Sequence, residues 1–171
     1  MKYSLKLLSL SALLAAMTIV LTTFIKIPIG NGYVHLGDSV IYLASCTLPF
    51  PYALFVAATG GALSDALSGY VIYIIPSLVI KALITLPFSA KSAVILTKRN
   101  AFMLIPAGLI GITGYFAAGL FFFGKSGAII GVYGDVMQAI GSSVLFLVFA
   151  AALDKIRFKE NIIKKATTAN H

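Results

Sequence analysis

Residues 101–123 have the sequence AFMLIPAGLIGITGYFAAGLFFF, which contains no charged side chain. A helix that crosses a bilayer needs about 20 consecutive, mostly apolar residues, so this stretch is long enough to span one. The rest of the chain has the same character. Of its 171 residues, 60% are hydrophobic and only 11% are charged, whereas about a quarter of the residues of soluble domains carry charge. The sequence therefore predicts an all-α integral membrane protein, built as a bundle of transmembrane helices.

Short breaks rich in proline, glycine or charge divide the chain into apolar segments. Pro49 and Pro51 predict a tight turn between the second and third segments, because proline does not fit a helix interior. The second segment is the shortest and carries Asp38 near its start. The first segment could instead be a secretory signal, but it is long and no small-x-small cleavage site follows it, which favours a retained helix. The predicted helices cover approximately residues 5–25, 36–50, 51–69, 72–90, 101–123 and 127–153.

The basic residues predict the orientation. Ten of the 13 Lys and Arg residues lie at the two ends of the chain or in the loop at residues 91–100. Cytoplasmic loops carry an excess of these residues, so both termini and this loop are predicted to be cytoplasmic. Termini on the same side require an even number of crossings, which agrees with the six predicted helices. Residues 1–171 then form a single membrane domain, in which 154–171 is a basic cytoplasmic tail that we expect to fray. The basic segments are short and lack interleaved aromatic residues, so we expect no nucleic-acid binding.

Polar side chains share one face on several predicted helices. Tyr73, Ser77 and Lys81 are each four residues apart, which stacks them along a helix. Asp135 and Gln138 are three residues apart on the last helix. An ionisable group inside a bilayer is costly unless it is paired or faces water, so such groups mark candidate functional sites. In the predicted orientation most of these groups lie in the outer half of the membrane, which favours a polar cavity open to the outside.

Other interpretations of the same polar groups stay open. They could form a buried network that only fixes helix packing. The tyrosines could be interfacial belt residues, a common role of Tyr at that depth. Lys81 is predicted to lie near mid-membrane, where it needs a partner, and Asp65 or Asp135 are the expected ones.

Signatures of metal sites and enzymes are absent from the sequence. His35 lies close to Asp38, but the only other histidine is His171 and the only cysteine is Cys46, so no metal site or disulfide is expected. No catalytic residue and no cofactor is predicted, and a hydrogen bond to ligand or loop is the simpler role for His35. Residues 119–126, GLFFFGKS, match a phosphate-binding pattern, but they end an apolar helix instead of following a strand, so we expect no nucleotide there.

Ala12 and Ala16 form a small-xxx-small pair on the first predicted helix. Such pairs let a second helix approach closely. Internal packing is the default role of the pair, and a docking surface for a partner subunit is the alternative.

Three segments of the chain resemble the S components, the substrate-binding subunits, of energy-coupling factor (ECF) transporters. They are residues 35–43, with HLGD followed by VIYL, residues 60–70, GGALSDALSGY, and residues 76–81, PSLVIK. The predicted six helices and the Ala12 and Ala16 pair are also similar to that family. The resemblance is to the branch that includes riboflavin, pyridoxine and thiamine-precursor S components.

The resemblance implies that the chain captures a vitamin or vitamin precursor outside the plasma membrane of a prokaryote. Delivery would follow docking, through Ala12 and Ala16, on a transmembrane scaffold subunit driven by two ATPase subunits. Aromatic side chains near the predicted cavity favour a heteroaromatic ring as ligand. The family binds its ligands in regions that match residues 31–38, 65–81 and 133–138. The candidate substrate-binding residues are Asn31, Tyr33, His35, Asp38, Asp65, Tyr70, Tyr73, Ser77, Lys81, Tyr133, Asp135 and Gln138.

Two other classes of function are alternatives. A stand-alone secondary transporter or channel subunit is expected to show inverted repeats or broken helices, which the sequence does not display. A membrane-embedded enzyme needs a nucleophile with its base, or a metal constellation, and neither has suitable spacing here.

Overall fold

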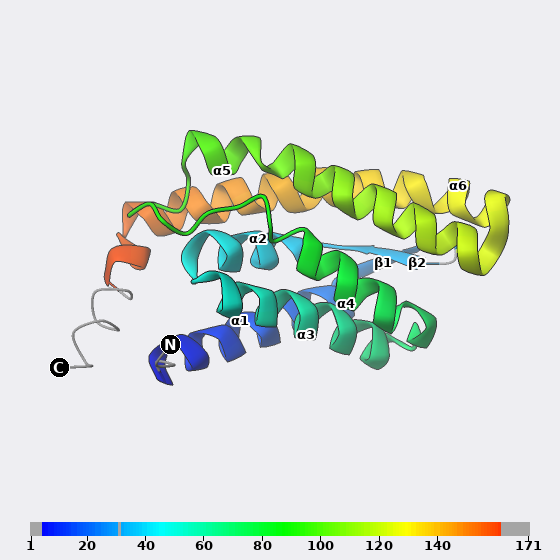
Figure 1. Cartoon of the computed structure of the whole chain (residues 1–171), viewed down its shortest axis with the longest axis horizontal. Helices are drawn as coiled ribbons and strands as arrows, with labels where there is room; N and C mark the ends of the chain where they lie inside the picture. The colour runs from blue at the N-terminus through cyan, green and yellow to red at the C-terminus, as the bar shows by residue number, and fades with distance from the viewer. Residues whose placement is uncertain (1–4, 31, 162–171) are drawn as a thin grey trace.

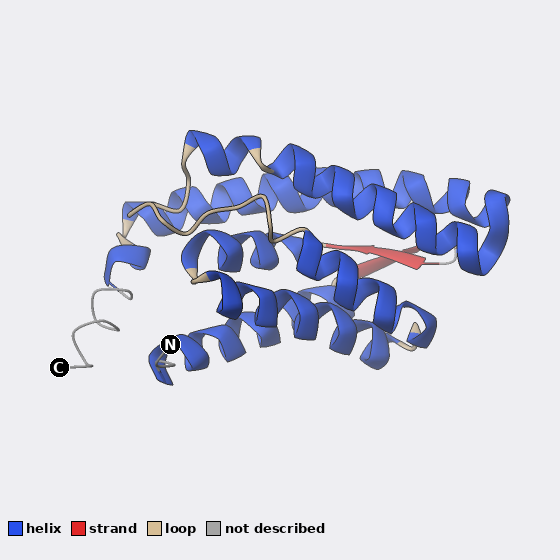
Figure 2. Ribbon diagram, viewed as in Figure 1, coloured by secondary structure: helices blue, strands red, loops and turns tan. Residues whose placement is uncertain are grey.

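The computed structural model describes residues 5–30 and 32–161, most of which are helical (Figure 1). The helices run along the long axis of the molecule, and a short β-hairpin lies between them (Figure 2). The predicted all-α character is thus confirmed apart from that hairpin. In chain order the elements are α1 (Leu5–Thr23), β1 (Lys26–Ile29), β2 (Gly32–His35), α2 (Asp38–Thr47), α3 (Phe50–Ser68), the 3-10 turn η1 (Val71–Tyr73), α4 (Ile74–Leu83), α5 (Lys98–Phe102) and α6 (Leu104–Lys155).

α6 consists of two helices joined at Gly124. This residue has φ 69°, a left-handed conformation that glycine adopts without steric cost, and the chain reverses there (Figure 1). The halves, residues 104–123 and 125–155, lie close to the predicted helices 101–123 and 127–153. By length and apolar composition, two stretches of the described chain could cross a membrane as helices, namely Leu5–Thr23 and the interrupted stretch Lys98–Lys155.

The segment before α2 differs from the expectation. Residues 26–35 form an antiparallel hairpin in which Lys26 pairs with His35, where the sequence suggested an irregular loop. α2 covers only ten residues, Asp38–Thr47, instead of 36–50, and all ten are buried. A ten-residue helix is about 15 Å long, half the hydrocarbon thickness of a bilayer. β2, which precedes α2, continues the segment formed by α2 toward the Gly124 end of the bundle (Figure 2).

α4 ends at Leu83, earlier than the predicted helix 72–90. Pro87 explains the early end, because it lacks an N–H donor and disfavours the helical conformation of the residue before it. The loop that follows is held by the last helix. The Asp154 carboxylate accepts hydrogen bonds from the backbone N–H groups of Ile95 and Leu96, each at 2.8 Å.

The start of the C-terminal tail is packed, so the expectation that the tail frays from residue 154 is wrong as far as residue 161. Lys159 is 2% exposed, and its ammonium donates hydrogen bonds to the carbonyl groups of Cys46 and Ala90, the latter at 2.9 Å. Burial lowers the pKa of Lys159. Residues 162–171 lie outside the described chain.

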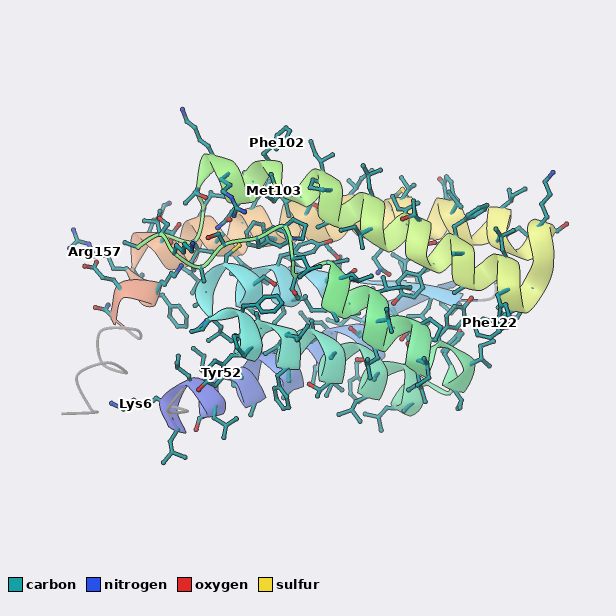
Figure 3. All side chains as sticks on the ribbon, in the orientation of Figure 1. Lys6, Tyr52, Phe102, Met103, Phe122 and Arg157 are labelled. Carbon is teal, nitrogen blue, oxygen red and sulfur yellow. The ribbon has the colours of Figure 1, made fainter. Side chains whose placement is uncertain are left out.

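Both ends of the described chain lie at the same end of the bundle. Figure 3 shows Lys6 and Arg157 at that end, and Phe122 at the opposite end near the turn in α6. α1 packs against α3, and α3 packs against α4. The second contact is close, because a Cβ added at Gly61 would lie 2.7 Å from Cγ of Lys81. Gly61 thus lets α4 bring the stem of Lys81 against α3.

Candidate functional site

A cavity of about 630 Å³, measured with its open side, lies near the Gly124 end of the bundle. The hairpin, the end of α3, η1 and both halves of α6 enclose it. Its lining residues are Ile29, Tyr33, Val34, His35, Asp65, Tyr73, Tyr115, Gly119, Gly127, Ala128, Gly131, Gly134, Asp135 and Gln138.

One wall of the cavity is aromatic and another is nearly bare backbone. The rings of Tyr73 and Tyr115 lie 6.2 Å apart, and Tyr33 comes from the hairpin. On the second half of α6, Gly127, Gly131 and Gly134 follow the spacing of one helix face. The lining therefore offers a ligand both aromatic rings and, at Gly131, helix backbone with open space beside it.

Tyr33 and Asp65 connect the hairpin to α3. The Tyr33 hydroxyl donates a hydrogen bond to Oδ1 of Asp65 at 2.6 Å. The phenol is the donor in this pair and Asp65 is the acceptor. Asp65 is 5% exposed, and its Oδ2 has no hydrogen-bond partner among the described residues. The carboxylate thus retains a free acceptor in the lining of the cavity.

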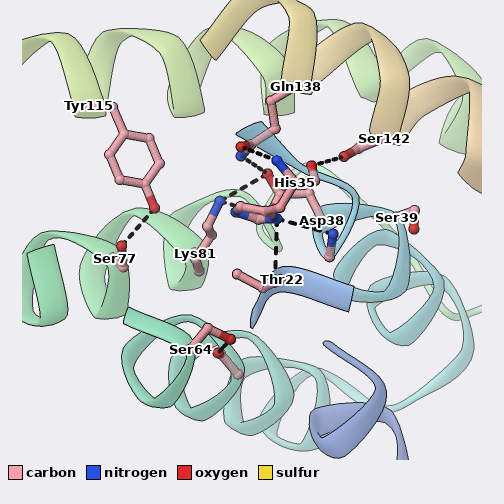
Figure 4. A network of polar contacts seen from close by, with 12 residues as sticks. Thr22, His35, Asp38, Ser39, Ser64, Ser77, Lys81, Tyr115, Gln138 and Ser142 are labelled. Carbon is pink, nitrogen blue, oxygen red and sulfur yellow. Dashed lines mark hydrogen bonds and ion pairs between the residues drawn. The ribbon is translucent and has the colours of Figure 1, made fainter. Parts of the chain in front are cut away.

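A buried ion pair joins Lys81 of α4 to Asp38 at the start of α2 (Figure 4). The Lys81 ammonium is 2.7 Å from Oδ1 of Asp38 and donates to Oδ2 at 2.9 Å, and both side chains are almost fully buried. Gln138 completes the network, because its amide donates to Oδ2 of Asp38 at 2.9 Å and accepts from the backbone N–H of His35 at 3.3 Å. The network ties the hairpin, α2, α4 and α6 together under the floor of the cavity.

His35 is neutral in this arrangement. Its Nδ1 accepts the backbone N–H of Gly37 at 3.1 Å and lies 3.3 Å from the Thr22 hydroxyl, so that nitrogen carries no proton. The imidazole therefore contributes no charge to the cavity.

Half of the substrate-binding residues predicted from the sequence line the cavity, and the others do not. Asp38, Ser77 and Lys81 lie in the layer below, where the Ser77 hydroxyl pairs with that of Tyr115 at 2.8 Å. Tyr70 packs on Tyr33 with ring centroids 4.6 Å apart and does not line the cavity. The candidates that line it are Tyr33, His35, Asp65, Tyr73, Asp135 and Gln138.

The predictions for Lys81, Tyr133 and Asn31 have different outcomes. Lys81 pairs with Asp38, so the expectation of Asp65 or Asp135 as its partner is wrong, because the start of α2 lies deep in the bundle next to α4. Tyr133 is 70% exposed on the outer surface of α6 and does not line the cavity. Asn31 lies outside the described residues.

Several lining residues were not among the candidates. Tyr115 is a polar aromatic residue within an otherwise apolar helix, and that position alone could have marked it. The glycines at 127, 131 and 134 share a helix face, which is a second signal that could have been used. Within residues 5–30 and 32–161, no three His, Cys, Asp or Glu side chains gather as they would to hold a metal ion.

Two pairs of small residues on α1 differ in exposure. Ser11 and Ala15 are buried, whereas Ala12 and Ala16 are exposed on the outer face of the helix. Of the two, the first pair provides the internal packing.

The structure is a helical bundle with a cavity near one end. Over residues 2–155 the sequence matches the family model described as "ECF-type riboflavin transporter, S component", and the chain belongs to this family. The family comprises membrane-embedded transporter components of prokaryotes rather than enzymes. The chain is also 26% identical over 125 residues to a protein of Pyrococcus woesei named "Uncharacterized protein in gap 3'region", and the aligned part covers 71% of this chain and 82% of the relative.

Proposed function

We propose that this chain is the substrate-capturing subunit of an ECF transporter that binds a heteroaromatic vitamin or vitamin precursor. The observation that carries the proposal is the cavity, whose lining combines tyrosine rings with glycines of the second half of α6. The family description makes riboflavin the first compound to test. Family membership also supports the partners, which are a transmembrane scaffold subunit and two ATPase subunits.

The cavity offers a flat ring both stacking and polar contacts. Tyr33, Tyr73 and Tyr115 provide ring faces, and offset or tilted stacking on such faces is favourable. Asp135 and Gln138 lie on the same lining and can bind the polar edge of the ring. A few polar groups within a mostly apolar wall are typical of small-molecule sites.

The orientation of the bundle supports capture from outside. The proposed arrangement has six crossings in the plasma membrane, with the basic end, where Lys6 and Arg157 lie, in the cytoplasm (Figure 3). The cavity lies toward the opposite end, near Gly124. A ligand would then enter from the outer side and be carried inward only after the chain docks on its partners.

Docking is proposed to use the outer face of α1. Ala12 and Ala16 are exposed, so they leave a shallow surface against which a helix of the scaffold subunit can pack closely. Ala15 is buried in a cluster with Ala53 and Val56 of α3, so α1 packs on α3 through a different face.

Ligand binding can be tested by filling the cavity. Gly131 lines the cavity, and a Cβ added there would meet no protein atom within 4 Å. Gly131→Leu should therefore occupy ligand space without disturbing the fold. Ala117→Leu is the control, since Ala117 lies at an exposed position on the first half of α6 and does not line the cavity.

Binding is measured with the purified full chain, without ATP, by quenching of riboflavin fluorescence and by native mass spectrometry of the protein purified from rich medium. We expect a bound ring compound on the unaltered protein and on Ala117→Leu, and at least about a tenfold loss of affinity in Gly131→Leu. Equal affinity in both variants would show that the ligand binds elsewhere. Absence of any ring compound on the unaltered protein would contradict the proposed function.

A further inference from the structure

Tyr115 is shared between the ligand cavity and two smaller cavities inside the bundle. Among the described residues, it alone lines all three of them. One of the smaller cavities also reaches Lys81 and Asp38, and the other reaches Asp38 and Gly108. Space beyond the ligand cavity therefore adjoins the Tyr115 side chain, so the ring keeps its place in the cavity wall only if other side chains fix it.

Two side chains of α4 contact Tyr115. The Ser77 and Tyr115 hydroxyl groups share a hydrogen bond at 2.8 Å (Figure 4), and the Lys81 ammonium lies 5.0 Å from the centre of the Tyr115 ring. Ser77 and Lys81 are four residues apart, so they lie on one face of α4. A cation within about 6 Å of the centre of an aromatic ring is attracted to the face of that ring. Ser77 thus holds the hydroxyl end of the side chain, and Lys81 holds the ring.

Asp38 keeps the Lys81 ammonium in this place. The ammonium lies 2.7 Å from Oδ1 of Asp38 and donates a hydrogen bond to Oδ2 at 2.9 Å. Lys81 is 3% exposed, and the attraction between a cation and a ring is stronger where water is excluded. Neither Lys81 nor Asp38 lines the ligand cavity. Any effect of this pair on a ligand in the cavity therefore passes through other residues.

We propose that Lys81 is a positioning residue of the ligand cavity. Held by Asp38, its ammonium fixes the Tyr115 ring as part of the cavity wall, and it acts on the ligand through that ring without touching the ligand. Because Tyr115 belongs to the proposed ligand site, this role rests on the proposed function. A wall that is fixed before the ligand arrives raises affinity, since less conformational entropy is lost on binding.

Fluorine NMR of the purified full chain tests the positioning without a ligand. Fluorotyrosine takes the place of Tyr115 in the unaltered chain, in Lys81→Met/Asp38→Asn and in Lys159→Met. The double variant leaves neither charge stranded and keeps an oxygen acceptor for the Gln138 amide. Lys159→Met is the control, because Lys159 is also a buried lysine but lines none of the three cavities.

We expect the fluorine resonance to have the same position and width in the unaltered chain and in the control. In the double variant it should move and broaden, because the ring is no longer held and has space to enter. A resonance unchanged in both position and width in the double variant would overturn the inference.

Binding of riboflavin to the full chain, measured by fluorescence quenching, tests the effect on the site. Lys81→Met/Asp38→Asn should weaken binding about tenfold, even though neither charge is stranded, whereas Lys159→Met should bind like the unaltered chain. The same double change should cause no further loss in Tyr115→Leu, which has no ring to hold. In Tyr115→Phe, which keeps the ring, it should weaken binding again. Equal losses in all three backgrounds would overturn the inference, because Lys81 would then act independently of the ring.

The outcomes separate this role from the proposed function. Riboflavin binding that the double variant leaves unchanged would overturn the positioning role and leave the proposed function standing. If the unaltered chain binds no ring compound, the proposed function is overturned, and the fluorine resonance still decides whether Lys81 fixes Tyr115. If Tyr115→Leu does not fold, the fluorine resonance and the Tyr115→Phe background decide the question.

Discussion

Replacing Lys81 by methionine should destabilise the protein strongly. The substitution keeps most of the side-chain volume but removes the charge that neutralises Asp38. The Lys81 and Asp38 side chains are only 3% and 7% exposed, so water cannot replace the lost partner. Asp38 would then keep Gln138 as its one donor among the described residues.

The size of the effect follows from the geometry. Two unit charges 2.7 Å apart attract by about 6 kcal/mol at an effective dielectric constant of about 20. Part of that attraction offsets the cost of burying both ions. Removing one partner of a buried pair typically costs about 3–5 kcal/mol, because the other charge is left unpaired. At about 2–4 °C per kcal/mol for a chain of this size, the midpoint of thermal unfolding should fall by roughly 6–20 °C.

Thermal unfolding of the purified protein in detergent measures this loss. The matched control is the double variant Lys81→Met/Asp38→Asn, which removes both charges and keeps an acceptor for Gln138. We expect it to recover at least half of the loss, since neither charge is then stranded. A fall of less than about 2 °C in Lys81→Met, or a double variant less stable than the single one, would refute the ion-pair reasoning.

Three further predictions concern other parts of the chain. Lys159→Met should lower stability by about 1–3 kcal/mol in denaturant unfolding and leave ligand affinity unchanged, because it strands two backbone carbonyl groups far from the cavity; a loss of affinity with normal stability would contradict this. His35→Leu should lower stability by about 1–3 kcal/mol in denaturant unfolding, because it removes the acceptor of the buried backbone N–H of Gly37; unchanged stability would contradict this. Ala12→Leu/Ala16→Leu should abolish uptake by the assembled transporter but spare ligand binding. The control Ala117→Leu, at an exposed position of α6, should leave both uptake and binding intact. Normal uptake by the double variant would show that the two alanines contact lipid and not the scaffold subunit.

The helical regions were predictable because they depend on local properties. An apolar stretch of about 20 residues predicts a spanning helix, and proline or glycine predicts its ends. Gly124 and the Pro49 to Pro51 turn lie where the sequence indicated breaks. The hairpin was not predictable in the same way. A four-residue strand in an apolar chain is stabilised by the helices around it, and those contacts are not encoded in local periodicity.

The candidate site was only partly predictable for a related reason. Spacing along one helix placed Asp135 and Gln138 on a common face, and both line the cavity. Pairing between helices depends on the fold, so the sequence could not specify that Asp38, 43 residues before Lys81, is its partner. Gly131 was missed because it has no polar group, although the shape of the cavity depends on its lack of a side chain.

Reconstitution in sealed vesicles tests the central claim most directly. Vesicles containing this chain alone, and vesicles containing the chain with its scaffold and ATPase subunits, are supplied with the ring compound that the purified chain binds. We expect the chain alone to bind the compound tightly but not to accumulate it in the vesicles, even with an ion gradient. We expect the full assembly to accumulate the compound when ATP is supplied. Accumulation by the chain alone would contradict the account, because it would make the protein an independent transporter.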